Sequence, residues 1–197
     1  MNPAPRVIKL GGSLLDWPPL AETFGHWLAR QSPAANVIIV GGGTLVEALR
    51  HVDRAHSLPA ETTHWLAIRA MSITAALAHG LLPQTELVTS LDRLPASPSQ
   101  CLCILDVEQF VRGDAHMPDA LPCSWEVTSD SIAARVAVRL GAQELVLLKS
   151  TLPAGATSHA ELAARGHVDA CFPHAARGLR VRSVNLRDDA FPEVLVG

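Results

Sequence analysis

The chain has 197 residues, of which 48% are hydrophobic and 18% are charged, and its formal net charge is −3. This length and apolar content are ordinary for one globular domain, which we expect to span residues 1–197. A net acidic chain lacks the basic footprint of a nucleic-acid-binding surface, so we expect no nucleic-acid partner.

The sequence also argues against membrane insertion and secretion. Residues 1–6 lack the apolar stretch of a signal peptide, and the longest apolar segment, residues 65–82, is interrupted by Arg69 and His79. The four cysteines form neither C-x-x-C pairs nor the framework of a disulfide-rich secreted domain. We therefore expect a cytoplasmic protein with no membrane contact.

Strand and helix patterns alternate along the chain. Short apolar runs predict strands at residues 7–10, 37–40, 87–88, 102–105, 145–148 and 179–184. Helical patterns cover residues 20–30, 44–56, 61–79, 131–140 and 158–165, and we expect a short helix after the last strand. Strands this uniformly apolar are covered on both faces, which predicts an α/β fold: a three-layer αβα sandwich with an open, mainly parallel sheet.

Two glycine-rich turns stand about one βαβ unit apart. Gly11-Gly12-Ser13 and Gly41-Gly42-Gly43 each follow a predicted strand and precede a predicted helix. Because parallel strands end at the same edge of a sheet, both turns are expected to face one crevice, where backbone N–H groups can approach a phosphate. The patterns G-x-G-x-x-G and G-x-x-x-x-G-K-[ST] are absent, which argues against a dinucleotide-dependent oxidoreductase and a P-loop enzyme. Tight connections without a ligand are the alternative interpretation.

The sequence contains only two lysines against fourteen arginines. Lys9 and Lys149 each lie at or near the end of a predicted strand, and a turn of small residues follows each. Lysine presents a compact ammonium that suits bridging of phosphate oxygens, so this placement favours phosphoryl chemistry over chance.

Asp130 falls in the first turn of a predicted helix whose N-cap is Thr128 or Ser129. It could be a simple capping carboxylate. Alternatively, Asp130 pairs with both lysines and holds their ammonium groups in place. Phosphoryl transfer requires mostly positioning and charge stabilisation from the protein, and such a trio would supply both.

These motifs together resemble the amino acid kinase superfamily, which includes acetylglutamate, aspartate, uridylate and isopentenyl phosphate kinases. The resemblance covers residues 7–151 and rests on Ile8-Lys9-Leu10-Gly11-Gly12-Ser13, Val40-Gly41-Gly42-Gly43, Thr128-Ser129-Asp130-Ser131-Ile132-Ala133-Ala134 and Leu147-Leu148-Lys149-Ser150-Thr151, in family order. It implies that Lys9 contacts the transferred phosphoryl group and that Asp130 organises Lys9 and Lys149. It further implies that phosphates and nucleotide are bound by Gly11, Gly12, Ser13, Lys149, Ser150 and Thr151, and the acceptor by Gly41, Gly42 and Gly43.

A narrower resemblance is carried by residues 64–71 and 124–131, which look like the small kinases of methanofuran biosynthesis. Those enzymes are implied to convert [5-(aminomethyl)furan-3-yl]methyl phosphate to its diphosphate with ATP. Asp53 or Glu61 could pair with the amine of such an acceptor, although each could equally be a solvated surface carboxylate. His64 could meet the acceptor, but a structural role is the simpler interpretation. The segment after Thr151 lacks the second glycine-rich, lysine-bearing segment of the superfamily, and no Asn precedes Asp130.

The motifs and the resemblance together predict an ATP-dependent kinase of a small phosphorylated or carboxylated acceptor, in which Mg²⁺ comes with ATP and the protein holds no metal site of its own. We expect a homo-oligomer. Uridylate or isopentenyl phosphate kinase activity is the alternative within enzymes. A non-catalytic nucleotide- or oxyanion-binding protein on the same fold is the alternative from another class.

Overall fold

A seven-stranded sheet forms the centre of the computed structural model, which describes residues 5–94, 102–153, 155 and 158–196. The strands lie in the order β3-β4-β2-β1-β5-β6-β7, and every neighbouring pair is parallel except β6 and β7. Their bounds are β1 Arg6–Leu10, β2 Asn36–Val40, β3 Glu86–Val88, β4 Leu102–Leu105, β5 Glu144–Lys149, β6 Val181–Asn185 and β7 Glu193–Val196.

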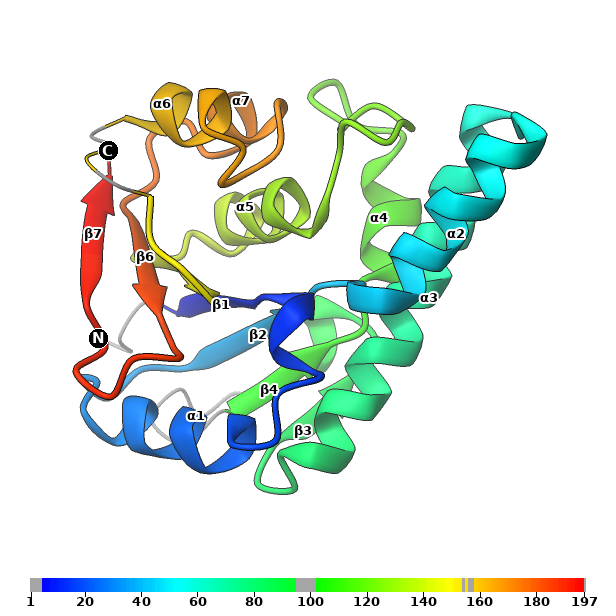
Figure 1. The fold of residues 1–197 in the computed structure, drawn as a ribbon. Helices are drawn as coiled ribbons and strands as arrows, with labels where there is room; N and C mark the ends of the chain where they lie inside the picture. The colour runs from blue at the N-terminus through cyan, green and yellow to red at the C-terminus, as the bar shows by residue number, and fades with distance from the viewer. Residues whose placement is uncertain (1–4, 95–101, 154, 156–157, 197) are drawn as a thin grey trace.

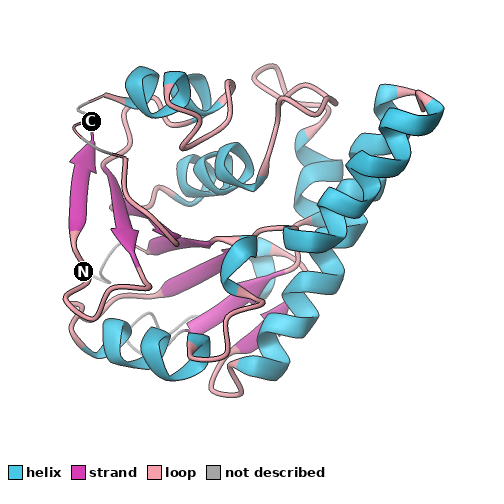
Figure 2. Cartoon of the chain, in the orientation of Figure 1, coloured by secondary structure: helices cyan, strands magenta, loops and turns pink. Residues whose placement is uncertain are grey.

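Helices cover both faces of this sheet, with α1 on one side and α5, α6 and α7 on the other (Figures 1 and 2). The α-helices are α1 Leu20–Ala29, α2 Gly43–His56, α3 Ala60–Leu81, α4 Glu108–Asp114, α5 Ser129–Leu140, α6 His159–Ala164 and α7 Phe172–Ala175. Two short 3₁₀ turns, Gly12–Leu14 and Leu91–Arg93, complete the described elements. The predicted three-layer, mainly parallel α/β architecture is therefore confirmed.

The core divides into one apolar cluster on each face of the sheet. Because side chains alternate along a strand, Val7 of β1 packs in the cluster that contains α5, whereas Ile8 packs in the cluster that contains α1. Helix α3 contributes to both clusters, with Ile68 in the α5 cluster and Ala78 in the α1 cluster.

Helix α2 projects from the body of the molecule and packs mainly on α3 (Figure 1). None of its residues is buried. Since α2 adds little to the core, its placement beside the carboxyl ends of β1 and β2 is the feature that matters for the site. Within the described part of the chain, no helix is long and apolar enough to cross a membrane.

The C-terminal segment is the part of the fold that the sequence prediction got wrong. Instead of a short helix after β6, the chain turns back and adds β7 antiparallel to β6. Along this strand exposed residues alternate with more buried ones, from exposed Glu193 to buried Val196. This alternation is typical of a half-buried edge strand and not of a helix. Helices α4 and α7 were not predicted, because seven and four residues are too short to show a clear helical period.

Candidate functional site

Strand register brings the two lysines together. Lys9 lies opposite Leu147 in the β1–β5 pair, and Lys149 is two residues further along β5. Lys9 follows Val7 by two residues, and Lys149 follows Leu147 by two residues. Because residues two apart on a strand face the same side and both Val7 and Leu147 face α5, both lysine side chains lie on the α5 face at the carboxyl ends of their strands. The alternation that builds the core thus also directs both ammonium groups to one point.

Asp130 occupies that point, in the first turn of α5. The Thr128 side chain accepts a hydrogen bond from the Asp130 backbone N–H and caps the helix, as predicted. Asp130 Oδ1 lies 3.0 Å from Lys9 Nζ, and Asp130 Oδ2 accepts a hydrogen bond of 2.8 Å from Lys149 Nζ. The side chains of Lys9, Asp130 and Lys149 are 6%, 7% and 15% exposed, so one buried carboxylate holds both ammonium groups.

Burial and charge shift the acid–base behaviour of this trio. Burial alone would raise the pKa of the Asp130 carboxyl, but the charges and hydrogen bonds of Lys9 and Lys149 outweigh it and the pKa is lowered. Burial and the neighbouring Lys9 charge lower the pKa of Lys149 to about 8, against the opposing pull of Asp130. The pKa of Lys149 therefore lies well below that of an ordinary lysine, and perturbed pKa values of this kind are common at functional sites.

A loop from the far end of the chain anchors the start of α5. The Asp169 carboxylate accepts hydrogen bonds from the backbone N–H and hydroxyl of Thr128, from the same two groups of Ser131, and from the backbone N–H of Cys171. Two residues earlier, the His167 carbonyl accepts a hydrogen bond of 2.6 Å from Lys149 Nζ. This loop fixes the helix turn that carries Asp130 and also holds Lys149 directly.

The two glycine turns pack against each other. A Cβ on Gly12 would lie 2.2 Å from the Gly43 nitrogen, and a Cβ on Gly41 would lie 2.7 Å from the Gly12 nitrogen. Gly43 also has a φ of +53°, which side-chain-bearing residues rarely adopt. Glycine is therefore required for this contact, and the turns converge on one edge of the sheet as the sequence predicts.

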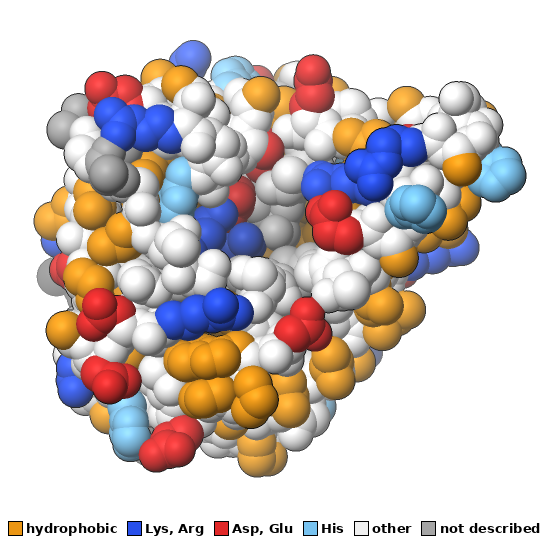
Figure 3. Space-filling model, viewed as in Figure 1, with side chains coloured by type: hydrophobic (Ala, Val, Ile, Leu, Met, Phe, Trp, Pro, Cys, Tyr) orange, Lys and Arg blue, Asp and Glu red, His pale blue; other side chains and the backbone are white. Residues whose placement is uncertain are grey.

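A cavity of about 550 Å³ opens over these turns, between α2, α3 and the segment that leads into α5. Figure 3 shows a hollow on this face with basic side chains on its floor and rim. The charged and polar side chains of the lining, as the structure describes it, are Ser13, Asp16, Thr44, Glu47, Arg50, His64, Ser124, Trp125, Thr128, Ser129 and Arg187. Its apolar wall comes from Val46, Ala67, Ile68, Met71, Val127 and Ile132.

One wall of the cavity is an ordered cluster around Trp125. Its indole N–H donates a hydrogen bond of 2.8 Å to Asp53 Oδ2, and the Arg50 guanidinium lies 5.1 Å from its ring centroid. Arg50 in turn pairs with Glu47 at 2.8 Å, across one turn of α2. The cluster joins α2 to the segment before α5 and presents an aromatic face, a cation and a carboxylate.

Not every residue assigned from sequence reaches the cavity. Gly12, Ser13 and Gly41–Gly43 line it, and Lys9, Asp130 and Lys149 converge at the adjoining strand ends, whereas Ser150 and Thr151 follow β5 outside the lining. Both oxygens of Asp53 are engaged, one with Trp125 and the other with the Leu58 backbone N–H at 2.9 Å. Glu61 is exposed at the start of α3, outside the lining. Among the described residues, no group of three or more His, Cys, Asp or Glu side chains could hold a metal ion.

Sequence reasoning missed Asp169, Arg187 and the pair of Glu47 and Arg50. Asp169 and Arg187 come from loops after α6 and β6, where no local pattern distinguishes them from surface residues. For Glu47 and Arg50 the three-residue spacing on a helix predicts a shared face, but which face meets the crevice follows only from the packing of α2.

Comparisons with known proteins bear on the family resemblance. The model of the amino acid kinase family matches residues 5–151. The [5-(aminomethyl)furan-3-yl]methyl phosphate kinase of Methanocaldococcus jannaschii is 25% identical over 142 residues, which are 72% of this chain and 63% of that protein. This chain therefore spans less than two thirds of the length of that relative.

Solved structures show the same fold. UMP kinase from Ureaplasma parvum superposes with a TM-score of 0.65 at 14% identity, over 100% of both chains. Uridylate kinase from Archaeoglobus fulgidus superposes with a TM-score of 0.57 at 16% identity, over 98% of this chain and 91% of that one. Aspartate kinase from Synechocystis superposes with a TM-score of 0.62 at 16% identity, over 98% of this chain and 40% of that one. At these identities the likeness concerns the fold alone.

Proposed function

The chain belongs to the amino acid kinase family, and from this premise we propose that it is an ATP-dependent phosphotransferase whose acceptor is [5-(aminomethyl)furan-3-yl]methyl phosphate. The observation that carries the proposal is the buried trio of Lys9, Asp130 and Lys149 beside two glycine turns. A protein that merely bound an oxyanion would not need two ammonium groups held on one carboxylate. The trio therefore favours a catalytic protein over a non-catalytic binding protein.

In the proposed reaction, an oxygen of the acceptor phosphate forms a bond to the γ-phosphorus of ATP. The bond from that phosphorus to the β,γ-bridging oxygen breaks, and its electron pair leaves with ADP. The attacking oxygen is already deprotonated in a phosphate monoester dianion, so the protein needs no general base. What it must supply is alignment and positive charge around the transferred group.

The described residues can supply both. Lys9 and Lys149 offer ammonium groups that are fixed before substrate binds, so little reorganisation is needed as charge moves from one phosphate to the other. The abutting turns bring backbone N–H groups and the start of α2 to the same edge, where a phosphate is favoured. Mg²⁺ carried by ATP would neutralise part of the phosphate charge and would keep most of its water ligands, so it requires few ligands from the protein.

The cavity lining supports a small acceptor that carries an amine, a ring and a phosphate. Glu47 or Asp16 could pair with the amine, and both line the cavity, unlike Asp53 and Glu61. Trp125 offers a face for a flat ring, and the Gly41–Gly43 turn offers N–H groups for the first phosphate. An isopentenyl phosphate kinase would have no use for these carboxylates, whereas the polar side chains of the lining make UMP the competing acceptor that the assay must separate.

The test offers purified protein, ATP and Mg²⁺ with [5-(aminomethyl)furan-3-yl]methyl phosphate, UMP and isopentenyl phosphate in separate reactions. The proposal predicts the highest kcat/KM for the aminomethylfuran phosphate. Glu47→Gln should raise KM for this acceptor and leave KM for ATP unchanged, and Glu22→Gln on the outer face of α1 is the control. A much higher kcat/KM for UMP or isopentenyl phosphate would refute the acceptor while leaving the kinase proposal in place. Cytoplasmic location and homo-oligomeric assembly stay predictions.

A further inference from the structure

Arg187 reaches the mouth of the cavity from the loop between β6 and β7. The preceding residue, Leu186, donates its backbone N–H to the Lys149 carbonyl at 2.9 Å, so this loop runs beside the end of β5. The Arg187 guanidinium donates a hydrogen bond of 3.0 Å to the Ser13 carbonyl and lies 5.7 Å from the ring centroid of Trp17. It therefore lines the cavity next to the first glycine turn.

The Arg187 side chain is exposed at the cavity mouth, and its charge is not neutralised by an ion pair with any described residue. Among the described residues, Arg187 forms no ion pair with a carboxylate, whereas Arg6, Arg50, Arg112, Arg135 and Arg182 each do. A guanidinium carries several N–H donors in a planar fork, and the Ser13 carbonyl accepts from one of its nitrogens. The remaining donors are available to a ligand at the cavity mouth.

The site has more need of positive charge than the two lysines can meet. Lys9 and Lys149 share Asp130, so one net positive charge remains from the trio. Two phosphorylated substrates bring several negative charges to the same edge. An arginine fork matches phosphate geometry and binds two of its oxygens at once, which a lysine cannot do.

We propose that Arg187 is a third cationic residue of the site and binds the phosphate groups of ATP at the point of transfer. This inference rests on the proposed phosphotransferase function and deepens it. As the acceptor oxygen bonds to the γ-phosphorus and ADP departs with the electron pair, Arg187 donates N–H groups to the phosphate oxygens. It transfers no proton.

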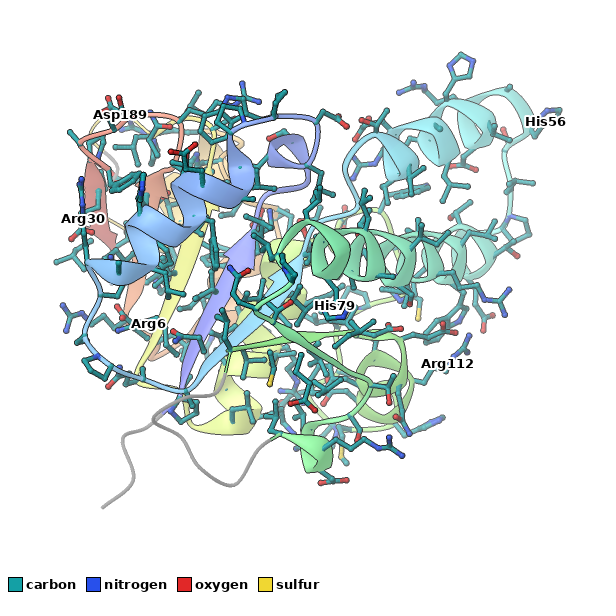
Figure 4. The ribbon with its side chains drawn as sticks, turned by 90° about the horizontal axis from the view of Figure 1, so that it is seen from below. Arg6, Arg30, His56, His79, Arg112 and Asp189 are labelled. Atoms are coloured by element: carbon teal, nitrogen blue, oxygen red, sulfur yellow. The ribbon has the colours of Figure 1, made fainter. Side chains whose placement is uncertain are left out.

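The chain provides a matched control in Arg30. This residue likewise donates to a backbone carbonyl, that of Asp189 in the β6–β7 loop at 3.3 Å, and lies over an aromatic ring, that of Phe191 at 4.7 Å. Figure 4 shows Arg30 and Asp189 along the edge of the molecule where α1 lies. Arg30 does not line the cavity, so Arg30→Gln removes a comparable structural contact without touching the proposed phosphate site.

The first measurement compares Arg187→Gln, Arg187→Lys and Arg30→Gln by steady-state kinetics and thermal unfolding. Arg187→Gln should lose about 10²-fold in kcat/KM, the scale of one preorganised electrostatic contact. Arg187→Lys should recover part of this loss because it keeps the charge but not the fork. Arg30→Gln should keep wild-type kcat/KM with a similar change in Tm. Equal losses in Arg187→Gln and Arg30→Gln would overturn the inference.

The second measurement does not depend on the acceptor. Isothermal titration calorimetry with ATP and with inorganic tripolyphosphate should show binding to the wild type, and about tenfold weaker binding to Arg187→Gln, because one charge-assisted hydrogen bond is lost. If the wild type binds tripolyphosphate and turns over no acceptor, the proposed function fails, yet weaker binding by the variant still supports Arg187 as a phosphate ligand. Equal binding by wild type and Arg187→Gln would overturn the role of Arg187 whatever the substrate.

Discussion

Lys9 and Lys149 are chemically different although both ion-pair with Asp130. Lys9 lies within β1, where its side chain is only 6% exposed. Lys149 ends β5, is 15% exposed, and additionally donates to the His167 carbonyl. The structure therefore assigns the two ammonium groups separate environments, and substitutions of each should give distinguishable results.

Lys9→Ala tests the first of them. We expect a loss of roughly 10²–10³ in kcat, the scale of one preorganised charge contact. Lys9→Arg should not restore activity, because a wider guanidinium does not fit a buried position shaped for an ammonium 3.0 Å from Asp130. Steady-state kinetics measure this, with circular dichroism to show that the fold persists. Near-wild-type turnover in Lys9→Ala would contradict the assignment.

Lys149 should set the alkaline limit of activity. Because burial and the Lys9 charge lower its pKa to about 8, the ammonium loses its proton as the pH rises through that value, and kcat/KM should fall. Stability should change in the opposite direction. Between that pKa and the ordinary lysine value, the unfolded chain binds the proton that the native chain has released, so the free energy of unfolding rises with pH.

Measuring kcat/KM and urea unfolding over the same alkaline range separates the two effects. Activity that falls while stability holds or rises is the predicted result. Activity that stays constant well above pH 8 would show that the Lys149 charge is not required.

At the scale of elements, the loop after α6 is the support of the site. The Asp169 carboxylate caps α5 from 41 residues away, through four hydrogen bonds from Thr128 and Ser131. An asparagine at this position would place its side-chain N–H donors opposite the N–H and O–H donors of Thr128 and Ser131. Its negative charge also raises the pKa of Lys149.

Asp169→Asn should therefore have three effects: lower stability by about 1–3 kcal/mol, lower kcat, and a shift of the alkaline limb of kcat/KM to lower pH. The shift is the diagnostic result, because a purely structural residue would not move a pKa. Asp188→Asn, which removes a carboxylate that accepts from the Ala190 backbone N–H on the surface, is the matched control. An unmoved alkaline limb would limit Asp169 to a structural role.

Alanine substitutions at two glycines, Gly12 in the contact between the turns and Gly25 in α1, should change stability in opposite directions. Gly12→Ala would place a Cβ 2.2 Å from the Gly43 backbone nitrogen, so the turns must separate, and both stability and activity should fall. Gly25→Ala, in α1 with nothing within 4 Å of the new Cβ, should instead stabilise the protein by about 0.5–1 kcal/mol. Thermal unfolding of the two variants checks this, and a tolerated Gly12→Ala would show that the turns are not in close contact.

The sequence predicted those parts of the fold and site that local patterns control. The convergence of Lys9 and Asp130 could be predicted because each lies at a position that its own element defines, a strand end and the first turn of a helix. Their catalytic role stays a prediction. Asp169 and Arg187 could not be found, because their positions depend on how distant loops pack onto the sheet. Strand β7 was missed for a related reason, since its four residues become a strand only by pairing with β6.

At the scale of the whole molecule, the cavity lies between the carboxyl ends of the buried strands and helix α2, which projects from the body. Lys9, Asp130 and Lys149 belong to β1, α5 and β5, which are packed into the core, whereas α2 buries none of its residues. In the proposed function, the catalytic side is thus fixed by the fold, and the acceptor side is lined by side chains of α2 and α3. This division explains how one fold can keep the chemistry and change the acceptor.

Phosphorus NMR of the reaction tests most directly whether this crevice transfers a phosphoryl group from ATP to a phosphate. With wild-type protein, ATP, Mg²⁺ and [5-(aminomethyl)furan-3-yl]methyl phosphate, we predict that the acceptor resonance is replaced by the two coupled resonances of a diphosphate while ADP appears. The same mixture with Lys9→Ala should show neither on that timescale. An unchanged acceptor resonance, or release of inorganic phosphate as the sole product, would contradict the account.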